Sequence, residues 1–82
     1  MTHEGIWQAI DMLAHKNKMS CSKLAVRSGL DATTFNKSKR FSTFGQPRWP
    51  SMQSISKILA ATSTTPAEFG SFLEQCEKQK QK

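Results

Sequence analysis

The hydrophobic residues of the chain recur three or four positions apart, which is the spacing of one face of an α-helix. The first stripe contains Ile6, Ile10 and Leu13, and the last runs from Phe69 to Cys76. No stretch shows the alternation of apolar and polar residues that is typical of a half-buried strand. The pattern therefore predicts an all-α fold with five helices, at residues 4–16, 21–28, 32–39, 52–61 and 66–76.

Polar residues that can cap a helix precede four of these segments. Ser20, Asp31 and Ser51 stand immediately before the predicted second, third and fourth helices, where a side-chain oxygen can accept from a free backbone N–H. Thr65 and Glu68 have the spacing of a capping box at the start of the fifth helix. The only clear loop is residues 41–50, which contain one Gly and two Pro.

A chain of 82 residues has room for one small domain. We assign this domain to residues 1–76 and interpret residues 77–82 as a basic polar tail or the start of a linker. No run approaches the roughly 18 apolar residues of a membrane span, and the first residues lack the layout of a secretory signal. We therefore expect a soluble, cytoplasmic protein.

Positive charge is concentrated in the middle of the chain. Residues 16–48 carry eight Lys or Arg against Asp31 alone, whereas residues 1–15 and 49–77 each have a net charge of −2. The whole chain has a net charge of +6. A single basic block is the charge distribution that a polyanion-binding surface requires, although a merely solvated face is the alternative.

The sequence gives little support for an enzyme. Ser20 and Lys23 match a Ser-x-x-Lys pattern, but that chemistry needs a larger domain and partner motifs. We interpret His15 as a surface or helix-end residue rather than a catalytic base. Cys21 and Cys76 are expected to be reduced thiols, and no spacing predicts a metal site or a cofactor.

Residues 21–40 have the layout of a helix-turn-helix, in which two short helices meet at a tight turn. Leu24 is expected to point inward, and Ala25 is small where the two helices approach each other. Gly29 permits the positive φ of the turn, Leu30 fills the elbow, and Phe35 anchors the next helix to the core. The second helix of such a motif can enter the major groove of DNA.

With those side chains inward, the remaining residues of the predicted third helix point outward. Asn can pair with adenine, Lys or Arg with guanine, and the methyl group of Thr or Ala can contact thymine. An outward surface of this kind can read bases. The residues concerned are Ala32, Thr33, Asn36, Lys37 and Arg40, with Thr34 nearer the edge.

At this point the sequence resembles the Cro and lambda-repressor-like helix-turn-helix transcriptional regulators. More narrowly, it is similar to the amino-terminal domains of bacterial and prophage repressors that carry a LexA-like serine-peptidase domain. The resemblance covers roughly residues 4–73. It is carried by Ile6-Trp7-Gln8-Ala9-Ile10, Leu24-Ala25, Gly29-Leu30-Asp31, Thr33-Thr34-Phe35-Asn36-Lys37-Ser38-Lys39-Arg40 and Arg48-Trp49-Pro50-Ser51.

The resemblance implies two sets of DNA-contacting residues. Residues of the recognition-helix face would read bases: Ala32, Thr33, Thr34, Asn36 and Lys37. Polar and basic residues around it would contact phosphates: Ser20, Ser22, Lys23, Lys39, Arg40, Arg48 and Ser51. Ser28 and Ser38 depart from the motif, because apolar residues are usual at those positions.

We therefore expect a sequence-specific double-stranded DNA-binding domain of a phage-type repressor that recognises an inverted-repeat operator. The alternative is a protein-interaction module of the same fold, such as an antitoxin or an anti-repressor adaptor. Trp49 either packs the loop onto the core or lies near the DNA backbone. Phe41 and Phe44 are interpreted as partly buried loop anchors rather than base-stacking wedges. Phe72 and Cys76 either cover the core or leave a strip for a homodimer.

Overall fold

The computed structural model describes the backbone of residues 1–80 and shows an all-α chain over that range. This part of the chain contains four α-helices and one short 3-10 helix, whereas the sequence predicted five α-helices. Their bounds are α1 His3–Lys16, α2 Cys21–Arg27, η1 Lys37–Lys39, α3 Met52–Ala61 and α4 Pro66–Lys80. Helix α4 continues beyond residue 76, into the predicted tail, and residues 81–82 of that tail lie outside the described residues.

The predicted caps are confirmed at three helices. The hydroxyl of Ser20 accepts from the N–H of Lys23, and that of Ser51 accepts from the N–H of Ser54. At α4, Thr65 and Glu68 exchange two hydrogen bonds of 3.1 Å, each from a backbone N–H to the other side chain, as a capping box requires. These local contacts explain why the helices begin where the sequence indicated.

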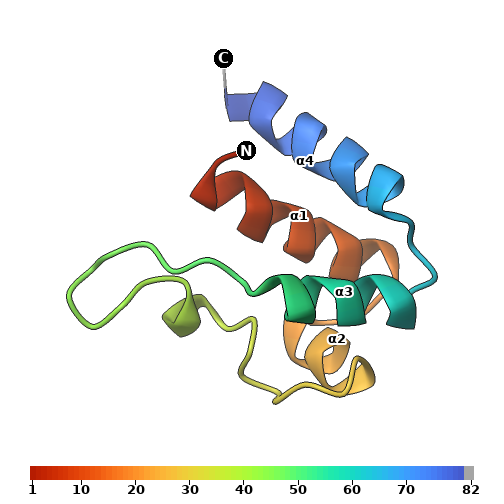
Figure 1. Ribbon diagram of the computed structural model, residues 1–82, viewed down its shortest axis with the longest axis horizontal. Coiled ribbons are helices and arrows are strands. Elements are labelled where there is room, and N and C mark those ends of the chain that lie inside the picture. Colours follow the sequence, from red (N-terminus) through yellow and green to blue (C-terminus); the bar gives the residue numbers. More distant parts are fainter. Residues whose placement is uncertain (81–82) are drawn as a thin grey trace.

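Helix α1 lies at the centre of the fold, with α4 packed along one side and α2 on another, while α3 packs against α2 (Figure 1). The hydrophobic core is formed by residues from all four helices together with Phe35. Its buried members are Ile6, Trp7, Ala9, Ile10, Leu13, Ala14, Leu24, Ala25, Phe35, Ile55, Ile58, Phe69, Phe72 and Cys76. Because Phe72 and Cys76 are buried in this core, they leave no free strip for a second subunit.

The predicted third helix, at residues 32–39, is wrong. The carboxylate of Asp31 accepts from the backbone N–H of Thr33 at 2.8 Å and from its hydroxyl at 2.6 Å. The hydroxyl of Thr34 donates back to the carbonyl of Asp31 at 2.6 Å. Such side-chain bonds compete with helical ones, and β-branched residues are poor helix formers. The chain therefore makes one turn, becomes extended at Asn36 and then forms η1.

Candidate nucleic-acid interface

The first half of the predicted motif forms as expected. Leu24 and Ala25 of α2 are fully buried, and Gly29 has a φ of +77° directly after the helix. The N–H of Leu30 donates to the carbonyl of Ala25 at 2.8 Å, which closes the end of α2. This turn ends α2 and leads into the segment that contains Phe35.

Phe35 fixes the path of those residues although they are not helical. Its side chain is fully buried, and its ring lies edge-on to the ring of Trp7 at a centroid distance of 6.4 Å. Ala32, Thr33 and Lys37 are exposed on either side of it. The predicted base-reading residues therefore lie on a turn that the side chain of Phe35 anchors to the core.

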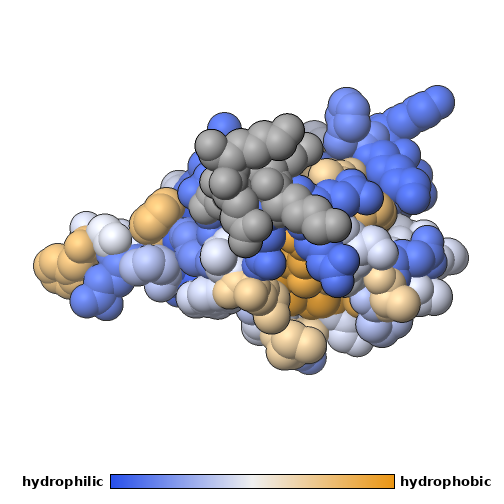
Figure 2. Space-filling view, turned by 90° about the horizontal axis from the view of Figure 1, so that it is seen from above, coloured by the Kyte–Doolittle hydropathy of each residue, from blue (hydrophilic) through white to orange (hydrophobic). Residues whose placement is uncertain are grey.

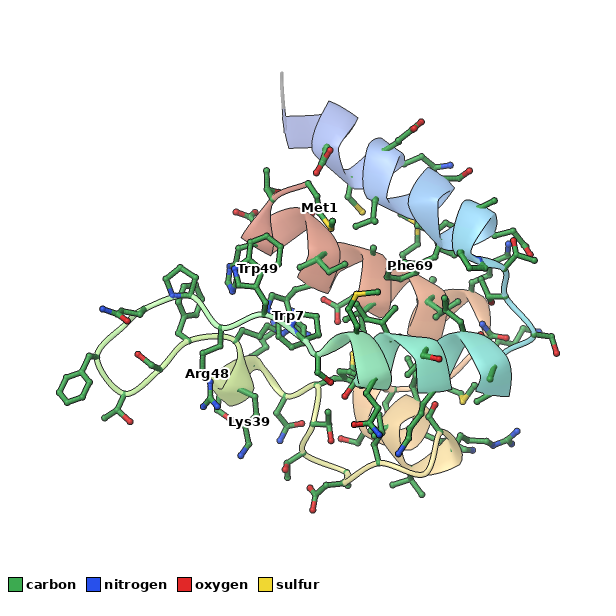
Figure 3. All side chains as sticks on the ribbon, viewed as in Figure 1. Met1, Trp7, Lys39, Arg48, Trp49 and Phe69 are labelled. Carbon is green, nitrogen blue, oxygen red and sulfur yellow. The ribbon has the colours of Figure 1, made fainter. Side chains whose placement is uncertain are left out.

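Five predicted DNA-contacting residues line a groove beside the amino end of α3, which we call the α3 groove. They are Thr33, Thr34, Lys39, Arg48 and Ser51. The groove has a volume of about 350 Å³ and is completed by Trp7, Asp31, Trp49, Pro50 and Ser54. Figure 3 shows Lys39 and Arg48 on the same side of the chain, below Trp7.

The α3 groove combines positive charge with hydroxyl groups. Lys39 and Arg48 are both exposed, and the Asp31 carboxylate, which also lines the groove, accepts two hydrogen bonds from Thr33 through Oδ1. Those two hydrogen bonds also lower the pKa of Asp31, the hydroxyl bond contributing most. The hydroxyls of Thr33, Thr34 and Ser51 donate within the protein. Two cations and the positive end of a ten-residue helix are the groups that can bind a phosphate here.

Four other predicted residues line a second groove, of about 380 Å³, beside the start of α2, which we call the α2 groove. They are Ser20, Asn36, Lys37 and Arg40. Asp11, Ala14, His15, Met19, Cys21 and Phe35 form the rest of its wall. Segment 31–40 therefore has a groove on each side. The remaining predicted residues, Ala32, Ser22 and Lys23, are exposed but line neither groove.

The guanidinium of Arg40 is bonded within the protein and is not free to contact DNA. Its guanidinium donates two hydrogen bonds to Asp11, at 2.8 and 3.0 Å, and a third to the carbonyl of Phe35 at 3.1 Å. It also lies over the ring of Trp7, 4.9 Å from the centroid, and only 12% of its side chain is exposed. We therefore withdraw Arg40 from the predicted phosphate contacts and base-reading surface, because its charge is engaged inside the protein.

Asp11 joins three elements through one carboxylate. Burial alone would raise its pKa, but hydrogen bonds from Arg40 and from the Cys21 thiol outweigh that effect and hold the pKa below its ordinary value. Burial, followed by the hydrogen bond to Asp11, raises the pKa of Cys21 to about 11. The thiol of Cys21 is therefore protonated at neutral pH and acts as a hydrogen-bond donor.

A second polar cluster, formed by His3, Trp7 and the carbonyl groups of Arg40 and Arg48, holds the following loop. Nε2 of His3 lies 2.8 Å from the Arg40 carbonyl and 3.1 Å from the Arg48 carbonyl. The indole N–H of Trp7 donates to the same Arg48 carbonyl at 2.9 Å. The same indole N–H also lies 3.1 Å from Nε2 of His3, so the two rings and the two carbonyls form one polar group. We call this the His3 cluster.

Sequence reasoning missed the structural roles of His3, Trp7 and Asp11. The three residues follow one another at intervals of four on α1, so they share one face of that helix. Two polar residues, His3 and Asp11, thus share a helix face with the core residue Trp7. This spacing could have identified the face of α1 against which the segment after α2 packs.

The loop aromatic residues differ from the prediction. Phe44 is 92% exposed and is not a buried anchor, because it lies at the tip of a hairpin that extends beyond the core. Phe41 is half-exposed, but its ring packs against that of His3 at 4.9 Å. Trp49 also packs against His3, at 5.9 Å, with about half of its surface exposed. Trp49 therefore contacts the His3 ring but is not buried in the core.

No family model matches the chain, and neither a curated protein nor a solved structure matches it significantly. Within residues 1–80, no helix combines the length and the apolar character needed to cross a bilayer. The same residues bring together no group of three or more His, Cys, Asp or Glu side chains suited to a metal ion.

Proposed function

We propose that this protein binds double-stranded DNA in a sequence-dependent manner, as a transcriptional regulator of the repressor type. The observation that carries the proposal is the α3 groove, where Lys39 and Arg48 lie beside the Ser51 hydroxyl at the start of α3. This groove would hold a backbone phosphate. Between Asp31 and Glu68 the chain contains no acidic residue, so the charged residues of this stretch are all cations, which favours a polyanion.

In this proposal the exposed turn that follows Asp31 reads the bases, although it is not a helix. The side chains of Thr33, Asn36 and Lys37 supply a hydroxyl, an amide and an ammonium group within five residues. These are groups that pair with base edges in the major groove. We retain Ala32 and Thr34 as members of this reading segment, and Ser20, Ser22 and Lys23 as phosphate contacts from α2.

The test is a fluorescence-anisotropy titration with a pool of random duplex DNA at two salt concentrations, with sequencing of the bound fraction. We expect enrichment of an inverted repeat and an affinity that falls steeply as salt rises. Asn36→Ala should reduce discrimination between selected and random DNA by about 1–3 kcal/mol.

Arg48→Ala should instead weaken binding to both DNAs equally and reduce the salt slope by about one. Lys57→Ala is the matched control, since Lys57 is an exposed cation on α3 that lines neither groove. If Lys57→Ala weakens binding as much as Arg48→Ala, only net charge matters and the α3 groove is not the phosphate site. Absence of DNA binding at low salt would refute the proposal.

A second candidate function, a protein-interaction module, is favoured by an apolar groove between α3 and α4. This groove has a volume of about 370 Å³, and Met52, Leu59 and Leu73 contribute to its wall. Met52 is 76% exposed there. A stable complex with another protein that is lost in Met52→Glu, together with no salt-sensitive DNA binding, would support this function over the first.

A further inference from the structure

Residues 41–48 form a tight hairpin that extends away from the four α-helices. The N–H of Ser42 donates to the carbonyl of Gln46 at 2.7 Å, and Phe41 and Pro47 form an antiparallel bridge. At its base, the N–H of Arg48 donates to the carbonyl of Arg40 at 2.9 Å. Figure 1 shows this green segment extending to the left, beyond the four helices.

The base of the hairpin is attached firmly to the body. The His3 cluster binds the carbonyl groups at both ends of the hairpin, through contacts of 2.8 to 3.1 Å. The ring of Phe41 packs against His3 at the same place. The hairpin is therefore a projection with a fixed direction and not a free loop.

The tip of the hairpin is also held in one conformation. The hydroxyl of Ser42 accepts from the N–H of Phe44 at 3.2 Å and from the N–H of Gln46 at 3.1 Å. Gly45 has a φ of +79°, which an L side chain would strain. This arrangement holds the aromatic side chain of Phe44 in water, 92% exposed, at the end of an ordered support.

The surroundings of Phe44 indicate which partner would cover it. Lys39 and Arg48 lie at the foot of the hairpin, where Asp31 lines the same groove, and Glu4 and Asp11 line a pocket with Phe41. The hairpin itself contains no acidic residue. Figure 2 shows hydrophobic residues at the end of this projection, with strongly hydrophilic ones beside them. A narrow apolar tip on a cationic base matches duplex DNA, which has an anionic backbone around an apolar base stack.

We propose that Phe44 is a wedge that inserts between neighbouring base pairs of duplex DNA from the minor groove. Insertion of an apolar side chain partly unstacks one base step and bends the duplex. The inference rests on the proposed DNA binding and deepens it: the α3 groove holds the backbone, and the hairpin tip deforms the adjoining DNA. Because the tip is already ordered, insertion requires little further ordering of the protein.

The experiment uses the duplex recovered by selection, labelled with a donor and an acceptor dye at its two ends. The wild-type chain should increase energy transfer because it bends the duplex. Phe44→Ala should bind about tenfold more weakly, at an unchanged salt slope, and should leave the duplex straight. Phe44→Leu, which retains an apolar wedge, should keep most of the bend, and Thr43→Ala serves as the control at the neighbouring exposed position.

Each other outcome overturns the wedge in a different way. If Phe44→Ala binds and bends the duplex as the wild-type chain does, the wedge hypothesis is refuted but the proposed DNA binding is not. If the wild-type chain binds no duplex, both proposals are refuted. Tighter binding to the separated strands would make Phe44 a stacking platform for single strands instead. A homodimer that sediments without DNA and is lost in Phe44→Ala would assign the tip to self-association.

Discussion

The α1–α4 pair and the segment from residue 31 to 48 are held in place by different kinds of interaction. Helices α1 and α4 pack through continuous stripes of buried apolar residues, such as Ile6, Ile10 and Phe69. The segment has one fully buried side chain, Phe35, and is otherwise attached to α1 by polar contacts and by the ring contacts of Phe41 and Arg40. Repeated apolar contacts tolerate local changes, whereas a segment with few attachments depends on each of them.

The largest effect is expected where the segment has its only fully buried side chain. Phe35→Ala should destabilise the protein by about 3–5 kcal/mol, because it removes a fully buried ring from the core. Phe44→Ala, the same change nine residues later, should alter stability by less than about 0.5 kcal/mol, because that ring is exposed. Urea denaturation gives the free energy of unfolding of both variants, and an equal loss of stability in the two would contradict this prediction.

A smaller effect is expected at the polar attachment of the segment. Arg40→Ala should destabilise by about 1–2 kcal/mol, because Arg40 is mostly buried but Asp11 is 40% exposed and partly screened by solvent. A double-mutant cycle with Asp11→Asn separates the pair from the packing of Arg40 on Trp7. A coupling energy near zero would show that packing alone holds the guanidinium in place.

The smallest effect should appear in the acid dependence of stability. The folded pKa of Asp11 lies below its ordinary value of 3.8, so its contribution is present above that pH. It is lost as pH falls below 3.8 and through the lower, folded pKa. Urea midpoints measured from neutral pH into this range should decline less steeply in Asp11→Asn than in the wild-type chain. A parallel decline would show that Asp11 has the same pKa in the folded and unfolded states.

The helical part of the fold was predictable because its signals are local and repeated. Ser20, Ser51 and Thr65 cap helices where the sequence indicated, and Gly29 adopts the expected left-handed turn. Phe35 was also identified as a core residue. Each of these features depends on residues a few positions apart, so the pattern along the chain is sufficient to find it.

The conformation of the segment was not predictable in the same way. Asp31 was predicted to cap a third helix, but its side chain bonds to Thr33 in a single turn that does not continue as an α-helix. The contacts of Arg40 with Asp11 and of Arg48 with His3 link residues 29 and 45 positions apart. No periodic pattern reveals contacts over such separations. The sequence therefore indicated candidate residues of the site but not the conformation of the segment that carries them.

The His3 cluster has a consequence for how the hairpin can vary. One ring nitrogen contacts the carbonyl groups of both Arg40 and Arg48, so the two ends of the hairpin are joined independently of what lies between them. Doubling the length of a closed loop costs only about 0.6 kcal/mol in chain entropy. The residues between these ends therefore form an exchangeable module, in which insertions and transplanted tips can be tolerated without disturbing the four helices.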